Sequence, residues 1–363
     1  MKQRKIIFFH LFNDRSGSPK VLSQIVKVAS RNNNKTEVVT SDHSNGFLSG
    51  LGDTQSQLFY RRSENKLITL LYYVYSQVAL FVQCLKYSGS DTAFYINTMM
   101  PFGAAVAGKI KRIPVYYHVH ETSIKPKPLK IFLRWVIQVA AKKVIYVSKY
   151  LEQVESFSGL KYEVVHNGLD CIPVVRSKEI VDEFQVLMVC SLKKYKGVLE
   201  FVEIAHLSSE DKQLKFTLVL NATAEEIDKF FEKIDLPTNL TMHSRQKNLE
   251  KFYERSHLLL NLSKPNGWIE TFGLTILEGM SFGLPVIVPP VGGPTEIIRD
   301  GIEGYLIDSE STSLIRDAIY SFSRSPGHYQ EFSRRALKRS SEFSLEKFES
   351  KIVKLLNEIA YKS

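Results

Sequence analysis

Two glutamates stand eight positions apart in the stretch ETFGLTILE, which runs from Glu270 to Glu278 around a glycine and a run of apolar residues. The preceding HLLLNLS has the composition of a strand, and LTILEGMSF has that of a helix which Gly283 can end. Glu270 is therefore expected just before a helix and Glu278 within it.

The start of this helix predicts an anion site. Backbone N–H groups near Phe272, Gly273 and Leu274 have no partner inside the helix, and the positive end of the helix dipole lies there. Gly273 allows close approach to the backbone. At 1.5 Å rise per residue the two carboxylates lie about 10 Å apart, and each can accept hydrogen bonds from a vicinal diol. A diphosphate flanked by two polyols is a nucleotide sugar.

An ordinary structural explanation stays open on spacing alone. A glutamate ahead of a helix is favoured by the dipole, and a glutamate inside a helix is usually solvated. Apolar residues surround Glu278 in the sequence, however, and a poorly hydrated carboxylate needs a partner.

Short β-branched and aromatic stretches alternate with helical ones along the 363 residues, which predicts parallel sheets with helices on both faces. One series runs from KIIFFHLF to EVVHNG, and a second runs from FQVLMVCSL to GYLID. The interpretation is an α/β chain with a domain over residues 1–174, a second over 175–345, and a final helix, 346–363, that packs back on the first. Pro173 lies in the aperiodic stretch taken as the boundary.

Composition narrows the classes of partner. The three cysteines are unevenly spaced without CxxC, which gives neither a disulfide framework nor a zinc site and fits a reducing cytoplasm. The basic start lacks a long apolar run and a cleavage site, so no secretory signal is predicted.

The formal net charge is +10, and residues 1–170 hold 23 basic against 11 acidic residues. Such an excess suits nucleic acid or an anionic membrane, but no nucleic-acid-binding motif accompanies it, so no nucleic-acid partner is expected.

Two apolar stretches of the first domain bear on membranes. Residues 67–85 contain no charge and approach the roughly 20 residues that span a bilayer. Polar residues interrupt them and a strand follows closely, so a buried or surface-docked helix is favoured over a span, with shallow contact through Tyr72, Tyr73 and Phe81 as an alternative. Residues 125–143 mix basic side chains with Phe132, Leu133 and Trp135, as in a helix lying on anionic lipid or in an ordinary two-faced surface helix.

The segment 266–308 resembles the signature of glycosyltransferase family 4, whose members have the GT-B fold and retain anomeric configuration. The shared features are the E-x7-E pair with its phenylalanine and glycine, GLPVI, GG-x-x-E and DG-x-x-G. Weaker similarity covers SGSPKVL, YYHVHET, VVHNGLD and KKYKGVLEFVE. The resemblance implies two facing Rossmann-like domains with a cleft between them, the donor bound mostly by the second domain and the acceptor by the first.

The same resemblance implies roles in donor binding. Glu270 would contact hydroxyls of the donor sugar near the reacting carbon, and Glu278 would contact the ribose. Backbone N–H groups of Gly273 and Leu274, beside Phe272, would meet the diphosphate. Lys196 would place its ammonium on that diphosphate and stabilise the leaving group, although a lysine at a helix start is commonly just solvated.

The resemblance implies roles for further residues, by their position in the matching motifs. Gly17 would let a first-domain loop approach the donor. HVHE supplies two candidates for the family's active-site histidine, and His120 is preferred over His118 because it ends the strand. Ser244 stands where a glycine often lies beside the base. The family's diphosphate-binding Gly-Arg is replaced by Cys190 and Ser191, and Lys193, Lys194 or Arg245 could supply the second cation.

The resulting hypothesis is a retaining hexosyltransferase that moves a sugar from a uridine or guanosine diphosphate donor to a saccharide or lipid-diphosphate-linked acceptor. Bacterial surface polysaccharide synthesis (O-antigen, capsule or exopolysaccharide) is the expected setting. The enzyme would be cytoplasmic and peripheral at the inner membrane face. No Asp-x-Asp pair occurs, so neither a metal nor another cofactor is expected. A nucleotide-sugar epimerase of similar fold and a non-catalytic sugar-nucleotide binder are the alternatives.

Overall fold

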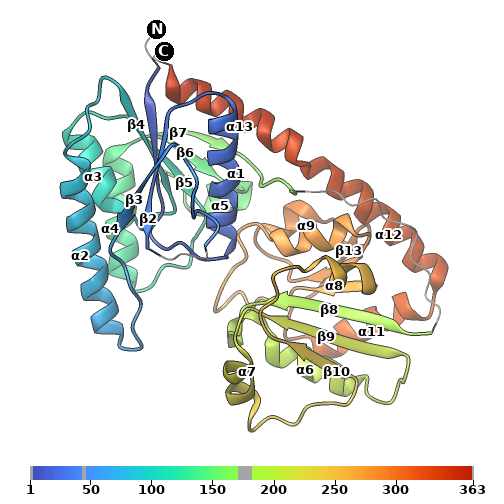
Figure 1. Cartoon of the computed structure of the whole chain (residues 1–363). Helices are drawn as coiled ribbons and strands as arrows, with labels where there is room; N and C mark the ends of the chain where they lie inside the picture. The colour runs from blue at the N-terminus through green and yellow to red at the C-terminus, as the bar shows by residue number, and fades with distance from the viewer. Residues whose placement is uncertain (1–2, 43–45, 171–181, 362–363) are drawn as a thin grey trace. The chain divides into compact units, whose positions relative to one another are not determined.

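The computed structural model of the chain describes residues 3–42, 46–170 and 182–361. The chain divides into two compact units, one formed by Met1–Gly168 with Leu345–Ser363 and the other by Leu169–Ser344 (Figure 1). Each unit is a Rossmann-like α/β domain with a parallel sheet, as the alternating sequence pattern predicts. The domain boundary placed near residue 175 lies outside the described residues.

The first unit contains a seven-stranded sheet in the order β3-β2-β1-β4-β5-β6-β7, in which every pair is parallel. The strands are β1 (Lys5–Phe9), β2 (Thr36–Ser41), β3 (Thr54–Leu58), β4 (Thr92–Asn97), β5 (Val115–Val119), β6 (Ala141–Tyr146) and β7 (Lys161–Val164). The sequence pattern missed β3, TQSQL, because this edge strand is polar and mostly exposed. The central strands β1, β2, β4 and β5 are almost wholly buried, as is usual for a sheet covered on both faces.

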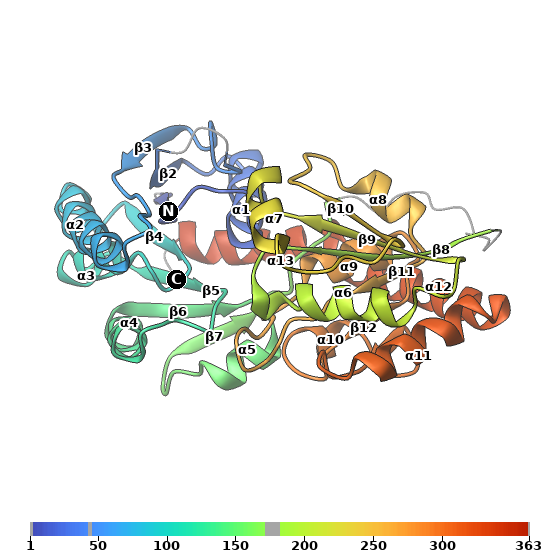
Figure 2. The same cartoon turned by 90° about the horizontal axis from the view of Figure 1, so that it is seen from below.

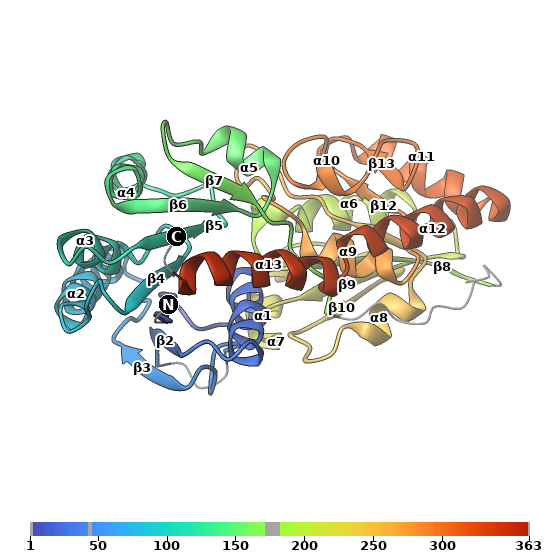
Figure 3. The same ribbon diagram turned by 90° about the horizontal axis from the view of Figure 1, so that it is seen from above.

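Helices cover both faces of this first sheet. They are α1 (Gly17–Arg31), α2 (Lys66–Cys84), α3 (Phe102–Ile110), α4 (Lys127–Ala140), α5 (Lys149–Val154) and α13 (Leu345–Ala360). Figure 2 and Figure 3 show α2, α3 and α4 side by side on one face, with α1 and α13 on the other. The last helix of the chain therefore packs within the first unit, where the Ala360 carbonyl accepts a hydrogen bond from the Arg4 backbone N–H at 2.9 Å.

The second unit contains a six-stranded parallel sheet in the order β10-β9-β8-β11-β12-β13. Its strands are β8 (Phe184–Cys190), β9 (Leu214–Leu220), β10 (Leu240–His243), β11 (Leu258–Leu260), β12 (Val286–Val288) and β13 (Gly304–Leu306). Its helices are the short 3-10 turns η1 (Lys194–Lys196) and η2 (Ser341–Phe343), with α6 (Val198–Leu207), α7 (Ala224–Phe231), α8 (Glu250–Arg255), α9 (Leu274–Ser281), α10 (Pro294–Ile297), α11 (Thr312–Ser323) and α12 (Pro326–Ser340).

The core of the second unit lies between strands β8 and β9 and helices α6, α11 and α12. Phe201 of α6, Phe216 of β9 and Phe322 of α11 are fully or almost fully buried there. Helix α9 lies on the other face of the sheet in Figure 1. Because all strands of a parallel sheet end at one edge, the loops after β8 and β11 meet there, and these loops carry the predicted donor-binding residues.

Candidate functional site

Lys196 and Glu270 form an ion pair in the second unit. Lys196 Nζ lies 2.8 Å from Glu270 Oε2 and 3.4 Å from Ser263 Oγ. The two side chains retain only 16% and 22% of their exposure, so Lys196 is not the freely solvated lysine that its place before a helix could suggest. Residues from the β8–α6 and β11–α9 connections, 74 positions apart, are thus brought together as one charged pair.

Two glycines hold the loop that carries Glu270. The Gly293 N–H donates to the Glu270 carbonyl at 2.8 Å. A Cβ on Gly292, whose φ is +87°, would lie 2.4 Å from the same carbonyl oxygen, and a Cβ on Gly293 would lie 2.3 Å from the carbonyl oxygen of Thr271. No side chain fits at that separation, so the two glycines of GG-x-x-E are explained by backbone packing behind Glu270.

The turn that carries Lys196 is held in the same way. Gly197 has φ +78°, and a Cβ there would lie 2.2 Å from the carbonyl oxygen of Leu262, which follows β11. The Lys264 N–H donates to the Tyr195 carbonyl at 2.8 Å, and a Cβ on Gly267 would lie 2.6 Å from Tyr195 Cβ. Close backbone contacts therefore fix both partners of the ion pair before any ligand binds.

An aromatic pair adjoins Lys196. Tyr195 and Trp268 stack at 5.9 Å with an interplanar angle of 21°, and Lys196 Nζ lies 5.3 Å from the centroid of the indole. Such a cation–π contact stabilises the ammonium and restricts its rotamers. The Trp268 indole N–H is buried, and it has no hydrogen-bond partner within the described residues.

Helix α9 begins where the sequence predicted. Gly273 precedes Leu274 with φ +108°, a conformation that residues with a side chain rarely adopt. Phe272 is buried and packs its ring 6.0 Å from that of Phe343. At the other end Gly283 has φ +74° and its N–H donates to the Met280 carbonyl at 2.9 Å, which confirms the predicted glycine cap.

Glu278 has the partner that its apolar neighbours required. The Tyr253 hydroxyl donates to Glu278 Oε2 at 2.8 Å, and the Tyr253 ring stacks 5.4 Å from Phe282. Burial, followed by the charge of Glu278, raises the pKa of Tyr253 well above its usual value, so the phenol stays protonated as a donor. Glu278 itself is half-buried and holds a fixed orientation on α9.

The remaining donor-side residues lie apart from this pair. Arg245 is exposed, and its Nε donates to Asn221 Oδ1 at 2.6 Å. The Ser244 carbonyl accepts from Gln246 Nε2 at 2.9 Å. Lys193 precedes η1 and Lys194 is its first residue, and both side chains are exposed.

In the first unit a row of polar side chains connects β1, β4 and β5. Asn97 Nδ2 donates to the Ser18 carbonyl at 3.1 Å and lies 3.0 Å from His10 Nδ1, while Asn97 Oδ1 lies 2.8 Å from His120 Nε2. Because a carbonyl can only accept, the Ser18 contact fixes the orientation of the Asn97 amide. Asn97 Oδ1 must then accept from His120, which leaves Nδ1 of His120 as its acceptor nitrogen.

The histidines of this row are neutral. Burial lowers the pKa of His10 to about 4 and that of His118 to about 3, and burial with neighbouring His118 and His10 lowers the pKa of His120 well below its usual value. His118 is fully buried, lies 2.9 Å through Nδ1 from the Tyr95 hydroxyl, and packs its ring 4.2 Å from that of His120. His118 therefore supports His120, which lies one residue past the end of β5 and is partly exposed.

Gly17 lies at the same edge of the first sheet. It opens α1 after the N-cap Ser16 and is exposed, one residue from the carbonyl that Asn97 binds. Glu121 also faces this edge, where its carboxylate accepts from the backbone N–H of Met99 at 2.7 Å and of His120 at 3.2 Å. Burial raises the pKa of Glu121 to about 7. The first unit thus gathers Gly17 and His120 at one edge.

Sequence reasoning missed several of these residues. Asn97 is a polar residue at the carboxyl end of the buried strand β4. His120 was selected because a polar residue at this end of a parallel strand faces the site, and the same argument selects Asn97. Tyr253 and Trp268 gave no signal, because only the tertiary fold brings them to Glu278 and Lys196.

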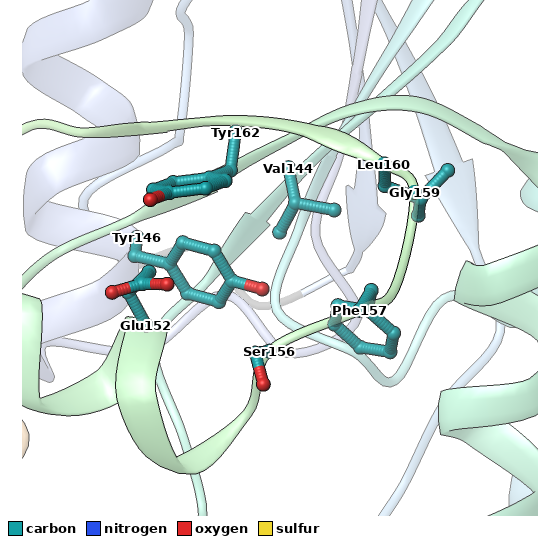
Figure 4. A pocket seen from close by; sticks show the side chains of 8 residues that line it. All are labelled: Val144, Tyr146, Glu152, Ser156, Phe157, Gly159, Leu160 and Tyr162. Carbon is teal, nitrogen blue, oxygen red and sulfur yellow. The ribbon is translucent and has the colours of Figure 1, made fainter.

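Two further observations concern metal ions and a hollow in the first unit. Among residues 3–42, 46–170 and 182–361, no group of three or more His, Cys, Asp or Glu side chains could hold a metal ion. Figure 4 shows a hollow of the first unit between β6, β7 and α5, lined by Val144, Tyr146, Glu152, Ser156, Phe157, Gly159, Leu160 and Tyr162. It contains none of the predicted site residues.

Comparison with known proteins gives a match to one family within the second unit. Residues 175–339 match the family described as glycosyl transferases group 1. The chain is 44% identical over 77 residues to a sucrose synthase of Denitrovibrio acetiphilus and 42% identical over 77 residues to sucrose synthase 4 of Oryza sativa. These stretches cover 20% of the chain and 10% of each relative, so the chain matches about a tenth of their length.

Solved structures with the same fold cover nearly the whole chain. The Anabaena protein HepE, in complex with UDP and glucose, gives a TM-score of 0.79 at 18% identity over 98% of this chain and 100% of that one. Sucrose-phosphate synthase from Thermosynechococcus elongatus gives 0.74 at 16% identity over 98% and 99%. The chain therefore has the GT-B fold, as the family resemblance implied.

Proposed function

We propose that the chain is a retaining glycosyltransferase of family 4 that takes a hexose from a nucleoside diphosphate sugar. The observation that carries the proposal is the Lys196–Glu270 pair, held by glycine packing next to the start of α9, within the region that matches glycosyl transferases group 1. An ammonium with three donors can contact Glu270 and a diphosphate together. The solved HepE complexes contain UDP, glucose and UDP-glucose, which supports a uridine nucleotide as the first donor to test.

The residues suit one order of events. The amides at Gly273 and Leu274 hold the diphosphate, Glu278 holds the ribose and Glu270 holds the sugar. The bond between the anomeric carbon and the diphosphate oxygen breaks while an acceptor hydroxyl attacks the same face. The hydroxyl proton passes to the departing diphosphate, whose charge Lys196 stabilises. His120 accepts a hydrogen bond from a sugar hydroxyl through Nδ1 and positions the reacting carbon.

The acceptor is proposed to be a saccharide or a lipid-diphosphate-linked saccharide, in the synthesis of a bacterial surface polysaccharide in the cytoplasm. The +12 balance of residues 1–170, 23 basic minus 11 acidic, supports an anionic acceptor. Neither a metal nor another cofactor is needed in this proposal, because helix amides and Lys196 supply the positive charge.

The test incubates the protein with UDP- and GDP-sugars and a panel of saccharide acceptors, and follows nucleotide release and the new glycoside by NMR. Transfer with retained anomeric configuration supports the proposal. Conversion of the donor to another sugar nucleotide without an acceptor would identify an epimerase. Donor binding with no nucleotide release under any acceptor would identify a binding protein.

A further inference from the structure

Two apolar stripes lie exposed on the outer surface of the first unit. The α2 stripe consists of Leu67, Leu71, Val74, Tyr75, Val78 and Val82, which are 49–71% exposed. The α4 stripe consists of Ile131, Phe132, Trp135 and Val139, which are 39–64% exposed. At about 100° per residue each set falls within a narrow arc of its helix, so both are continuous rows. Contiguous apolar surface of this kind marks an interaction site.

Helix α2 is fixed to the protein along its inner side. It is long and apolar enough to cross a membrane by length and composition, and 28% of its most apolar window is buried. The Tyr73 hydroxyl donates to the Met100 carbonyl at 2.8 Å, and the Gly103 N–H donates to Gln77 Oε1 at 3.0 Å. A Cβ on Gly103 would lie 2.2 Å from the Gln77 carbonyl oxygen. A helix packed this closely against α3 can offer only its outer row to a partner.

The exposed rows correct the sequence-based choice of contact residues. Tyr73 is 4% exposed and Leu133 is fully buried, so both belong to the interior. Tyr72 and Phe81 are only partly exposed. Phe132 and Trp135 do lie in the α4 stripe, as the amphipathic pattern of 125–143 predicted.

Basic residues border these stripes. Residues 59–142 hold 12 Lys and Arg against 3 Asp and Glu, a balance of +9. Lys66 and Lys127 are the exposed first residues of α2 and α4, and the exposed Arg61 and Lys125 precede these helices. Neither helix has an acidic residue in its first turn, and basic residues there are unfavourable for the helix dipole. The placement of Lys66 and Lys127 is therefore not explained by helix stability.

We infer that the α2 and α4 stripes with their basic border form a docking surface for an anionic lipid bilayer, on which the first unit lies without spanning it. Apolar side chains enter the acyl boundary while Lys and Arg meet lipid phosphates. In a parallel sheet the helices begin at the carboxyl edge, so this basic border lies at the same edge as Asn97 and His120. This docking surface does not depend on the donor chemistry proposed above.

The test is flotation of the full chain with vesicles of phosphatidylcholine alone or with added phosphatidylglycerol. Binding is expected to anionic vesicles and to weaken as salt rises, because exposed charges are screened within about 8 Å at physiological ionic strength. The triple variant Leu67→Gln, Leu71→Gln, Val78→Gln is expected to lower partitioning at least about tenfold. The triple variant Arg61→Gln, Lys66→Gln, Lys127→Gln is expected to lower it by about fivefold per residue.

Matched controls come from the second unit. Leu314→Gln changes a side chain that is 60% exposed on α11, and Lys212→Gln, Lys229→Gln, Lys233→Gln removes three exposed charges. Both controls should float like the wild type, and all variants should bind nucleotide alike by calorimetry. Absence of flotation, equal flotation with neutral vesicles, or a dimer that the α2 variant disperses in light scattering would each overturn the inference.

Discussion

Lys196 Nζ and Glu270 Oε2 lie 2.8 Å apart, although one was expected to hold a diphosphate and the other a sugar. Because each charge is the partner of the other, both side chains keep a fixed position at a largely buried place without a ligand. It also implies that ligand binding rearranges existing contacts more than it creates a site, which is the preorganisation that electrostatic catalysis requires.

Glu270→Ala is expected to lower kcat by at least about a hundredfold, because it removes a contact made to the reacting sugar. The fold should persist, since a partly exposed ion pair contributes about 1 kcal/mol or less to stability. Steady-state kinetics and thermal melting measure both effects. Glu254→Ala, at an exposed glutamate of α8, is the control and should leave kcat unchanged. Wild-type turnover in Glu270→Ala with unchanged melting would refute the assignment.

Glu278→Gln is expected to weaken nucleotide binding by about 10- to 100-fold, since a hydrogen bond to a charged group contributes about 1.5–3 kcal/mol. Tyr253→Phe leaves the carboxylate but removes its fixed donor, and should weaken binding by a smaller factor. Calorimetry with UDP and GDP compares the two variants. An unaltered Kd in Glu278→Gln would place the ribose elsewhere.

Asn97→Leu should lower kcat by about 10- to 100-fold, the usual effect of losing a residue that orients a functional group. Asn97 fixes the His120 tautomer, so the nitrogen-15 shifts of His120 should change from a protonated Nε2 to a mixture. Asn34→Leu is the matched control, because Asn34 is also buried and donates to the Ala29 carbonyl at 3.2 Å. If Asn97→Leu altered stability but neither kcat nor the shifts, Asn97 would be only structural.

Stability should fall below pH 6.5 through the buried histidines. Burial lowers the pKa of His118 to about 3 and of His10 to about 4, so below 6.5 the unfolded chain binds protons that the folded chain cannot. Each group then costs about 2 kcal/mol between pH 6.5 and 5. Glu121, whose pKa is raised to about 7, changes the stability in the opposite direction. Its contribution to the free energy of unfolding is present at low pH and is lost as the pH rises from 4.5 to 7.

The pH effect of one histidine can be isolated. His118→Asn keeps a polar group near the Tyr95 hydroxyl and removes one titration. Denaturant unfolding at pH 7 and pH 5 should show a smaller loss in this variant than in the wild type, by about 2 kcal/mol. Equal losses in both proteins would mean that His118 is protonated in the folded state.

The alternation of strands and helices was predictable because buried parallel strands are continuous apolar runs, as in β11 (LLL) and β12 (VIV). The polar edge strand β3 lacks that signal and was missed. The pairing of Lys196 with Glu270, and of Tyr253 with Glu278, could not be read from the sequence, since each pair joins residues from different elements, 74 and 25 positions apart. GG-x-x-E was visible as a motif, but its reason, backbone contact behind Glu270, required the fold.

The central claim is that a diphosphate rests at the start of α9, between Glu270 and Glu278. A crystal structure of the chain soaked with UDP tests it most directly. The account predicts β-phosphate oxygens within hydrogen-bond distance of the Gly273 and Leu274 amides and of Lys196 Nζ, with ribose hydroxyls on Glu278. UDP bound elsewhere, with that position empty or filled by packed side chains, would contradict it.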